Sequence, residues 1–170
     1  MMEFRTQRLW VRPFRPEDRE NMLDLLTDHQ VKQTYMLPDF PERQGAMPLF
    51  ERLLALSNQP DRYVAGICLE DTCIGLINET DRDGGSIELG YALLPRFHGR
   101  GYCTEALTGA IDHLFRQGFE EVLAGAFECN PASLRVMEKS GMKPLDRWEN
   151  IEYRGKVHRC VYRSIRRDGT

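Results

Sequence analysis

The sequence has no long apolar run. No stretch approaches the roughly 18 residues that a membrane-spanning helix requires, and the first residues, Met-Met-Glu-Phe-Arg, lack the hydrophobic core of a secretion signal. We therefore expect no membrane partner and a cytoplasmic location.

An excess of positive charge is also missing. The 23 Lys and Arg residues are outnumbered by 26 Asp and Glu residues, which gives a formal net charge of −3 and a pI near 5.8. Nucleic-acid binding requires a basic surface, and the arginine-rich stretch at 163–167 is too short to supply one. We expect no nucleic-acid partner.

Cysteine and histidine are too scattered to suggest a metal site. The five cysteines contain no C-x-x-C pair, and their odd number argues for reduced, mostly structural thiols. The four histidines, at positions 29, 98, 113 and 158, show no ligand spacing. We expect no metal, and we interpret Cys103 as a packing residue rather than a nucleophile.

Apolar residues make up 41% of the 170 residues, enough for one domain over residues 1–170 with its own core. Alternating and helical apolar patterns, separated by Pro and Gly, predict the order β, α, α, β, β, β, α, β, α, β, β. We expect strands at 8–14, 63–69, 72–79, 86–94, 121–127, 145–152 and 157–165, and helices beginning near 16, 49, 102 and 131. Residues 27–48 are expected to form a loop with at most a turn of helix.

The stretch Leu93–Leu107 is the most informative part of the sequence. An apolar run is followed by Gly99 and Gly101, and then by a helical pattern. Glycine at such a turn permits positive φ and lets a ligand approach the backbone, while the helix start offers unpaired N–H groups. Arg96 and Arg100 add charges that pair with phosphate. The stretch therefore predicts an anion site, most naturally for a pyrophosphate.

The glycine spacing separates several families of phosphate-binding loops. A nucleoside-triphosphatase loop needs four residues between its glycines and then Lys-Ser or Lys-Thr, and a dinucleotide fingerprint needs a third glycine where Thr104 stands. What remains is Arg-x-x-Gly-x-Gly, from Arg96 to Gly101. This pattern resembles the acetyl-coenzyme A pyrophosphate loop of the GNAT acyltransferase superfamily.

Two more segments extend the resemblance. I-E-L-G-Y-A-L-L-P begins at Ile87 and N-P-A-S-L-R-V-M-E-K-S-G-M begins at Asn130, on either side of R-F-H-G-R-G-Y-C-T-E-A-L from Arg96. Together they resemble the RimJ/RimL branch, which acetylates protein N-termini and includes many members of unknown substrate. The sequence departs from the branch at His98, where Trp is frequent, and at Met142, where Phe is frequent.

The resemblance implies the GNAT fold, a mainly antiparallel seven-stranded sheet with flanking helices, and acetyl-coenzyme A (acetyl-CoA) as co-substrate. It also implies that the loop backbone holds the pyrophosphate, while strand residues 91–93 pair with the pantetheine arm and offer an amide to the thioester oxygen. The implied coenzyme-binding residues are Tyr91, Ala92, Leu93, Arg96, Phe97, His98, Gly99, Arg100, Gly101, Tyr102 and Asn130.

Glu88 is our first candidate for the base that deprotonates the amine, acting through water. It stands where many GNAT enzymes keep a carboxylate, although a solvated or ion-paired strand glutamate is an equally good interpretation. Glu79 on the neighbouring strand is a second candidate. An α-amine needs no strong base, because its reference pKa of about 7.7 to 8.0 leaves a usable neutral fraction. We interpret Glu105 as structural, pairing locally or supporting the turn.

Asn130 and Ser133 each allow two interpretations. Asn130 is expected to cap the last helix and, by resemblance, to contact the pantetheine amide. Ser133 matches a serine that the branch places beside the coenzyme sulfur, where it would act as the acid for the leaving thiolate. The alternative for Ser133 is a helix-start hydroxyl that bonds only to the backbone.

The sequence therefore predicts an N-acetyltransferase that moves acetyl from acetyl-CoA directly to a primary amine, such as a protein N-terminal α-amine, with no covalent enzyme intermediate. One alternative is a small-molecule amine acetyltransferase. Another is a non-catalytic acyl-CoA binding or sensing domain, against which the presence of Glu88 and Ser133 argues. The expected partners are acetyl-CoA and an amine-bearing substrate, entering between loop 27–48 and the last hairpin, and the protein is expected to be a monomer or homodimer.

Overall fold

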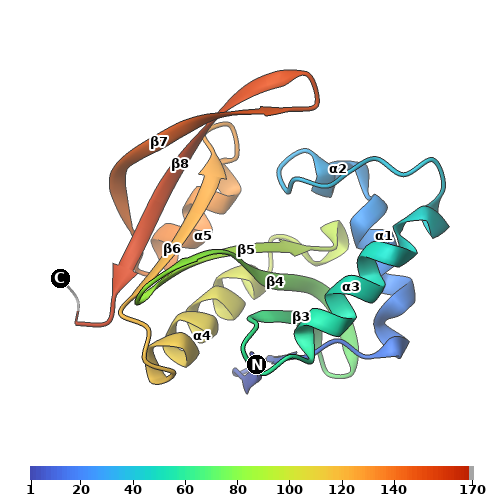
Figure 1. Cartoon of the computed structure of the whole chain (residues 1–170), viewed down its shortest axis with the longest axis horizontal. Helices are drawn as coiled ribbons and strands as arrows, with labels where there is room; N and C mark the ends of the chain where they lie inside the picture. Colours follow the sequence, from blue (N-terminus) through green and yellow to red (C-terminus); the bar gives the residue numbers. More distant parts are fainter. Residues whose placement is uncertain (169–170) are drawn as a thin grey trace.

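A computed structural model of the chain describes residues 1–168 and shows one eight-stranded sheet in the order β1-β2-β3-β4-β5-β6-β8-β7 (Figure 1). All neighbouring strands are antiparallel except β5 and β6, which are parallel. The strands are β1 (Phe4–Arg5), β2 (Leu9–Arg12), β3 (Val64–Leu69), β4 (Thr72–Asp83), β5 (Ser86–Leu93), β6 (Glu121–Phe127), β7 (Lys143–Tyr153) and β8 (Lys156–Arg166).

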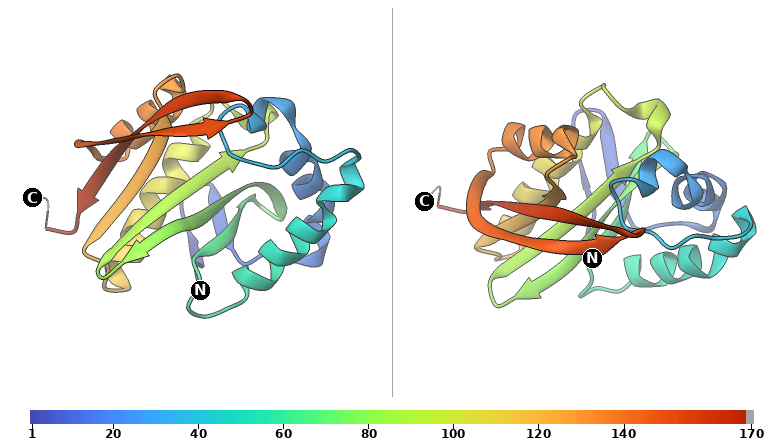
Figure 2. Two further views of the ribbon diagram at one scale, coloured as in Figure 1. Left: turned by 45° about the horizontal axis from the view of Figure 1, so that its top comes forward. Right: turned by 90° about the horizontal axis from the view of Figure 1, so that it is seen from above.

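Helices cover both faces of the sheet (Figure 2). α1 and α3 pack on one face, where Leu23 and Phe50 are buried in one hydrophobic cluster. α4 and α5 pack on the other face, where Leu107 and Met137 belong to a second cluster. The helices are α1 (Arg19–Thr27), α2 (His29–Lys32), α3 (Met47–Ser57), α4 (Tyr102–Arg116) and α5 (Pro131–Lys139), with 3₁₀ turns η1 (Pro16–Asp18), η2 (Arg43–Ala46) and η3 (Pro95–Phe97).

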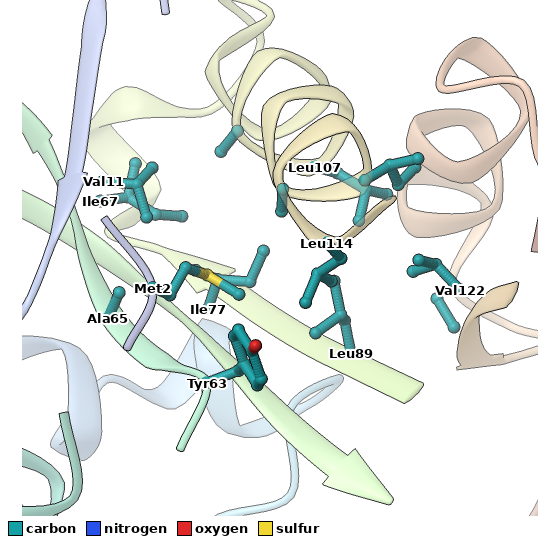
Figure 3. Packing of buried hydrophobic residues seen from close by; sticks show 14 of the residues in the cluster. Met2, Val11, Tyr63, Ala65, Ile67, Ile77, Leu89, Leu107, Leu114 and Val122 are labelled. Atoms are coloured by element: carbon teal, nitrogen blue, oxygen red, sulfur yellow. The ribbon is translucent and has the colours of Figure 1, made fainter. Parts of the chain in front are cut away.

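The larger cluster joins the sheet to α4. Figure 3 shows Val11, Ile67 and Ile77 from the strands facing Leu107 and Leu114 from the helix. Apolar residues recur along α4 at helical spacing, so one stripe of the helix is buried, as the sequence predicts. This burial fixes the start of α4, and therefore the glycine loop, at the end of β5.

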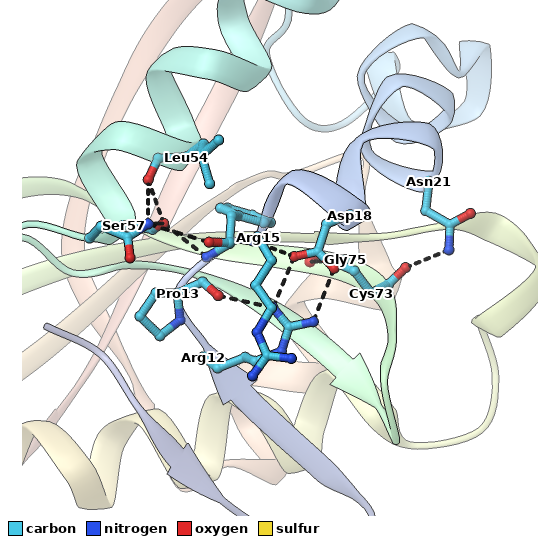
Figure 4. Close-up of polar contacts among 11 residues, drawn as sticks. Arg12, Pro13, Arg15, Asp18, Asn21, Leu54, Ser57, Cys73 and Gly75 are labelled. Atoms are coloured by element: carbon cyan, nitrogen blue, oxygen red, sulfur yellow. Dashed lines mark hydrogen bonds and ion pairs between the residues drawn. The ribbon is translucent and has the colours of Figure 1, made fainter.

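A buried ion pair organises the opposite face (Figure 4). The Arg12 guanidinium of β2 donates to both carboxylate oxygens of Asp18 in η1, at 2.9 and 3.0 Å, with both side chains almost fully buried. Beside them the Phe14 backbone N–H donates to the Ser57 hydroxyl at 2.9 Å. These bonds join β2 and the residues after it to η1 and to the end of α3.

The mixed α/β fold predicted from the sequence is confirmed, and the strand and helix order is as expected. The predicted count of seven strands is wrong, because the two-residue strand β1 also pairs with β2. A two-residue strand is too short to show any alternation in the sequence. The expected loop 27–48 contains the single turn α2 and the 3₁₀ turn η2. β4 continues to Asp83, four residues beyond its predicted end.

Candidate active site

The site lies where the parallel strands β5 and β6 separate. Their pairing runs from Ser86 with Glu121 to Leu89 with Ala124 and then ends. Beyond it, Gly90–Leu93 remains paired only with β4, so the other edge of this segment is open. A cavity of about 750 Å³ fills the gap, bounded by residues from α2, β5, β6, the glycine loop and α5.

The glycine loop forms one end of this cavity. Gly99 and Gly101 have φ of +75° and +79°, values that other residues seldom adopt, and α4 begins directly after Gly101. No atom lies within 4 Å of the position that a Gly99 side chain would occupy. Gly99, Gly101 and the first residues of α4 all line the cavity. Unpaired N–H groups at a helix start and an uncovered backbone are what a pyrophosphate requires.

A contact from the other end of the chain supports the loop. Arg8 donates to the Arg100 carbonyl oxygen at 2.9 Å and pairs with Glu105 at 2.7 Å, and its guanidinium lies 4.4 Å from the centre of the Tyr102 ring. Partial burial would raise the pKa of Glu105, but hydrogen bonds from Thr6 and Arg8 outweigh this and lower it. Glu105 therefore supports the turn, in agreement with the sequence-based interpretation.

Most of the predicted coenzyme-binding residues meet at the cavity. Its lining includes all of them except Arg96 and Arg100. Arg96 instead lines a separate surface pocket beside Asp24 and Asp28, and the Arg100 carbonyl is occupied by Arg8. His98 stands where Trp is frequent in the branch that the sequence resembles. Its ring lies 2.9 Å from the Leu93 carbonyl oxygen, and this contact holds the glycine loop to the end of β5.

Two other positively charged residues line the cavity, whereas Arg96 and Arg100 do not. Arg135 and Lys139, four residues apart on α5, both line it. The sequence-based reasoning missed them, although their spacing places them on one face of a helix. The α2 wall, which runs from Gln30 to Tyr35, lies within the loop 27–48 that we expected from the sequence to lie beside the acceptor, although none of its residues was singled out.

A hydroxyl pair links the two walls of the cleft. The Tyr91 hydroxyl of β5 and the Ser133 hydroxyl of α5 lie 2.8 Å apart. Burial raises the pKa of Tyr91 well above its ordinary value, so the phenol is protonated at neutral pH. Ser133 also donates its backbone N–H to the Asn130 side chain at 3.3 Å, which confirms Asn130 as the cap of α5. The Ser133 hydroxyl is free of this cap and belongs to the cavity wall.

Cys103 behaves as a packing residue. It lines the cavity next to the glycine loop, and burial raises the pKa of its thiol to about 12. A thiol with such a pKa is protonated at neutral pH and is a poor nucleophile.

Glu88 lies near the cavity but outside its lining. Its side chain is mostly buried, with Arg147 of β7 at 4.0 Å. Burial raises the pKa of Glu88, and the charges of Asp81 and Glu149 raise it further, while Thr80 and Arg147 oppose the shift. Glu79, the second candidate, is instead paired with Arg62 and Arg82. Of the two carboxylates, Glu88 is thus the less closely ion-paired.

Residues 1–168 contain no group of three or more His, Cys, Asp or Glu residues placed to hold a metal ion. In the same part of the chain, no helix is long and apolar enough to cross a membrane.

Comparisons with known proteins identify the family. Residues 8–143 match the model of the GNAT acetyltransferase domain, and the chain belongs to this family. A curated relative, the uncharacterized N-acetyltransferase p20 of Bacillus licheniformis, is 27% identical over 114 residues, which are 65% of this chain and 64% of the relative. The chain thus matches less than two thirds of that relative's length.

Solved structures agree in fold over nearly the whole chain. A GNAT-family acetyltransferase from Bacillus anthracis has a TM-score of 0.84 at 21% identity and covers 98% of this chain and 99% of its own. A Vibrio cholerae protein, provisionally described as a ribosomal-protein-serine acetyltransferase, has a TM-score of 0.76 at 19% identity, covering 97% of both chains. The spermidine N-acetyltransferase of Vibrio cholerae, solved with CoA and spermine, has a TM-score of 0.80 at 14% identity, covering 96% of this chain and 98% of its own.

Proposed function

We propose that the protein is an N-acetyltransferase that moves acetyl from acetyl-CoA to a primary amine within a ternary complex. One observation carries this proposal: a single cavity joins the glycine loop, the open edge of β5 and the Tyr91–Ser133 hydroxyl pair. These three features match the needs of a pyrophosphate, a pantetheine arm and a leaving thiolate, respectively.

The coenzyme would be held mainly by backbone. N–H groups from residues 99–102 would bind the pyrophosphate, and Arg135 and Lys139 would supply the positive charge that Arg96 and Arg100 were expected to provide. The open edge of Gly90–Leu93 would pair with the amides of the pantetheine arm as an added strand does. One of its N–H groups would then face the thioester oxygen and stabilise the oxyanion.

Transfer would proceed by direct attack of the amine on the thioester carbon. The C–N bond forms, the carbonyl electrons move to oxygen, and collapse of the tetrahedral intermediate breaks the C–S bond. The proton lost by the amine would pass through water to Glu88, whose raised pKa suits this role. The thiolate would take a proton from Ser133, which regains one from Tyr91 at 2.8 Å, and solvent restores the tyrosine proton.

The acceptor we favour is a protein N-terminal α-amine, as in the RimJ/RimL branch. The motifs around Gly101 and Asn130 support this choice, and so does the fold shared with the protein described as a ribosomal-protein-serine acetyltransferase. A small-molecule amine is the second candidate, because a spermidine N-acetyltransferase shares the same fold.

Release of free thiol from acetyl-CoA tests the function. Purified protein is incubated with acetyl-CoA and either a library of peptides with free N-termini or a set of polyamines and aminoglycosides, and the products are identified by mass spectrometry. We expect amine-dependent thiol release with the peptides. Thiol release with the small amines alone would show that the acceptor is a small molecule and not a protein N-terminus. Coenzyme binding without any acetylation would indicate a sensing domain.

A further inference from the structure

The wall of the cavity formed by α2 belongs to a long connection with few anchors of its own. Between α1 and η2, residues 28–42 contain only four helical residues. Val31 and Leu37 are buried in the cluster under α1 and α3, and the Tyr35 hydroxyl donates to the Asn78 side chain at 2.7 Å. These contacts fix the two ends of the wall to the N-terminal part of the sheet.

A second tyrosine fixes the same wall from the C-terminal part of the chain. Tyr153, at the end of β7, donates its hydroxyl to the Lys32 carbonyl oxygen at 2.6 Å and accepts a hydrogen bond from the Leu37 backbone N–H at 3.2 Å. The side chain is only 9% exposed. Both views of Figure 2 show the tip of the β7–β8 hairpin beside the α2 segment.

The ring of Tyr153 is itself firmly held. It packs beside Phe127 of β6 and His158 of β8, with ring centres 6.1 and 6.3 Å away, and these two rings stack on each other at 4.4 Å. The hydroxyl is therefore presented from a rigid base, and its two backbone bonds fix residues 32–37 relative to the hairpin. These hydrogen bonds join the β7–β8 hairpin to a segment that packs with α1 and α3.

The ion pairs at the same place contribute less. Asp39 pairs with Lys32 and with Arg154, but the Asp39 side chain is 73% exposed. Exposed pairs of this kind are screened by water and salt and add little stability. The buried hydroxyl of Tyr153 is thus the main polar link between the hairpin and the α2 wall.

We propose that the Tyr153 hydroxyl is a specificity-determining clamp that limits the width of the amine acceptor. This inference rests on the proposed function. With the clamp closed, the α2 wall that lines the cavity, from Gln30 to Tyr35, is held in place, and a slender amine reaches the thioester. A bulky acceptor needs the wall to move away, and therefore reacts only in proportion to the population of an open state.

Tyr153→Phe tests the clamp because it removes the hydroxyl and keeps the ring that packs on Phe127 and His158. One hydrogen bond ordinarily changes such an equilibrium by about tenfold. We expect the ratio of kcat/KM for a peptide beginning with Trp to that for one beginning with Gly to rise by about tenfold. Affinity for coenzyme A should stay unchanged, since no coenzyme contact is removed.

Two control variants separate the clamp from other effects. Tyr63→Phe changes another buried tyrosine, which packs against Phe119 away from the cavity, and should leave the ratio unchanged. Asp39→Asn weakens both exposed ion pairs beside the hairpin tip, with Lys32 and with Arg154, and leaves the hydrogen bonds of the Tyr153 hydroxyl in place, so it should change the ratio by less than twofold. A change in Asp39→Asn as large as in Tyr153→Phe would assign the clamp to the ion pairs and overturn the proposal.

Hydrogen exchange gives a second readout that does not depend on turnover. The Leu37 amide donates to Tyr153, so it should exchange about tenfold faster in Tyr153→Phe. Turnover with an unchanged ratio, or an unchanged Leu37 exchange rate, would overturn the clamp alone. Absence of acetylation by the wild type with any amine would instead overturn the proposed function, and the clamp's role in specificity with it.

Discussion

The two sides of the cleft are built in different ways. The coenzyme side consists largely of backbone: two glycines of positive φ, a helix start and the open edge of β5. The proposed acceptor side instead depends on side chains from distant parts of the chain, because Tyr153 bonds to the α2 wall and Arg147 lies 4.0 Å from Glu88. Backbone geometry suits a co-substrate that many proteins share, while side chains are free to vary and so set the choice of acceptor.

The two sides meet at Ser133, and its substitution should have the largest effect. In the proposed mechanism the hydroxyl donates to the sulfur only as negative charge develops there, so Ser133→Ala should reduce kcat far more than coenzyme affinity. A general acid commonly supplies about 10²- to 10⁴-fold, and a thiolate is already a good leaving group, so we expect about 10² or less. Steady-state kinetics with calorimetry for coenzyme A checks this.

The helix cap provides the control for Ser133. Asn130 accepts the Ser133 backbone N–H, and this bond survives the change to Ala. Wild-type turnover in Ser133→Ala would show that the hydroxyl is not the acid, and Tyr91 or ordered water would take that role.

Glu88→Gln probes the acceptor side alone. We expect kcat/KM to fall by about tenfold near pH 6.5, where an α-amine is mostly protonated and needs the base most, and by less above about pH 8. Coenzyme affinity should not change. If kcat/KM of the variant and of the wild type change in parallel across this pH range, Glu88 is not the base and its role is structural.

The stability of the same variant should respond in the opposite direction. Burial raises the pKa of Glu88 in the folded protein, so the stabilisation from this group is present below its ordinary pKa and is lost as pH rises through the raised one. At neutral pH the carboxylate is therefore destabilising, and Glu88→Gln should unfold at an equal or higher temperature than the wild type. Thermal unfolding at pH 4 and pH 7 measures this, and a loss of stability confined to pH 7 contradicts it.

Glu105→Gln should have the smallest effect, and only on the coenzyme side. The carboxylate accepts hydrogen bonds from Thr6 and from the Arg8 backbone and side chain, at 2.6 to 2.7 Å. Weakening them should loosen the glycine loop and reduce coenzyme A affinity by about threefold. Glu20→Gln, which weakens exposed pairs with Arg19 and Arg43, should leave affinity unchanged. Equal affinities for both variants would show that the loop needs no support from Glu105.

The contrast between the two sides also explains what the sequence could predict. The glycine turn could be predicted from Gly99 and Gly101, because few other residues tolerate such backbone angles. The helix that follows could be predicted from the apolar stripe of α4. The pairing of Asn130 with the start of α5 follows from local capping chemistry. The coenzyme side is local in sequence, so local rules describe it.

The remaining features depend on contacts between distant residues. The hydrogen bond from Tyr153 to Lys32 joins residues about 120 positions apart, and no sequence pattern around either residue predicts it. Arg96 was placed near phosphate because it stands next to the glycines, but it lines a different pocket, beside Asp24 and Asp28. Side-chain direction and long-range partners are set by the folded chain as a whole, which single-sequence patterns do not report.

Coenzyme A binding to the wild type and to Gly101→Val, measured by calorimetry, tests the central claim most directly. A Val side chain at φ of +79° would strain the turn and obstruct approach to the loop backbone. Gly118→Val is the matched control, because Gly118 has φ of +99° after α4 and lies outside the cavity lining. We expect Gly101→Val to bind at least about tenfold more weakly, or about 1.4 kcal/mol, and folded Gly118→Val to bind as the wild type does. Equal affinity in Gly101→Val, or no binding by the wild type, would contradict the account.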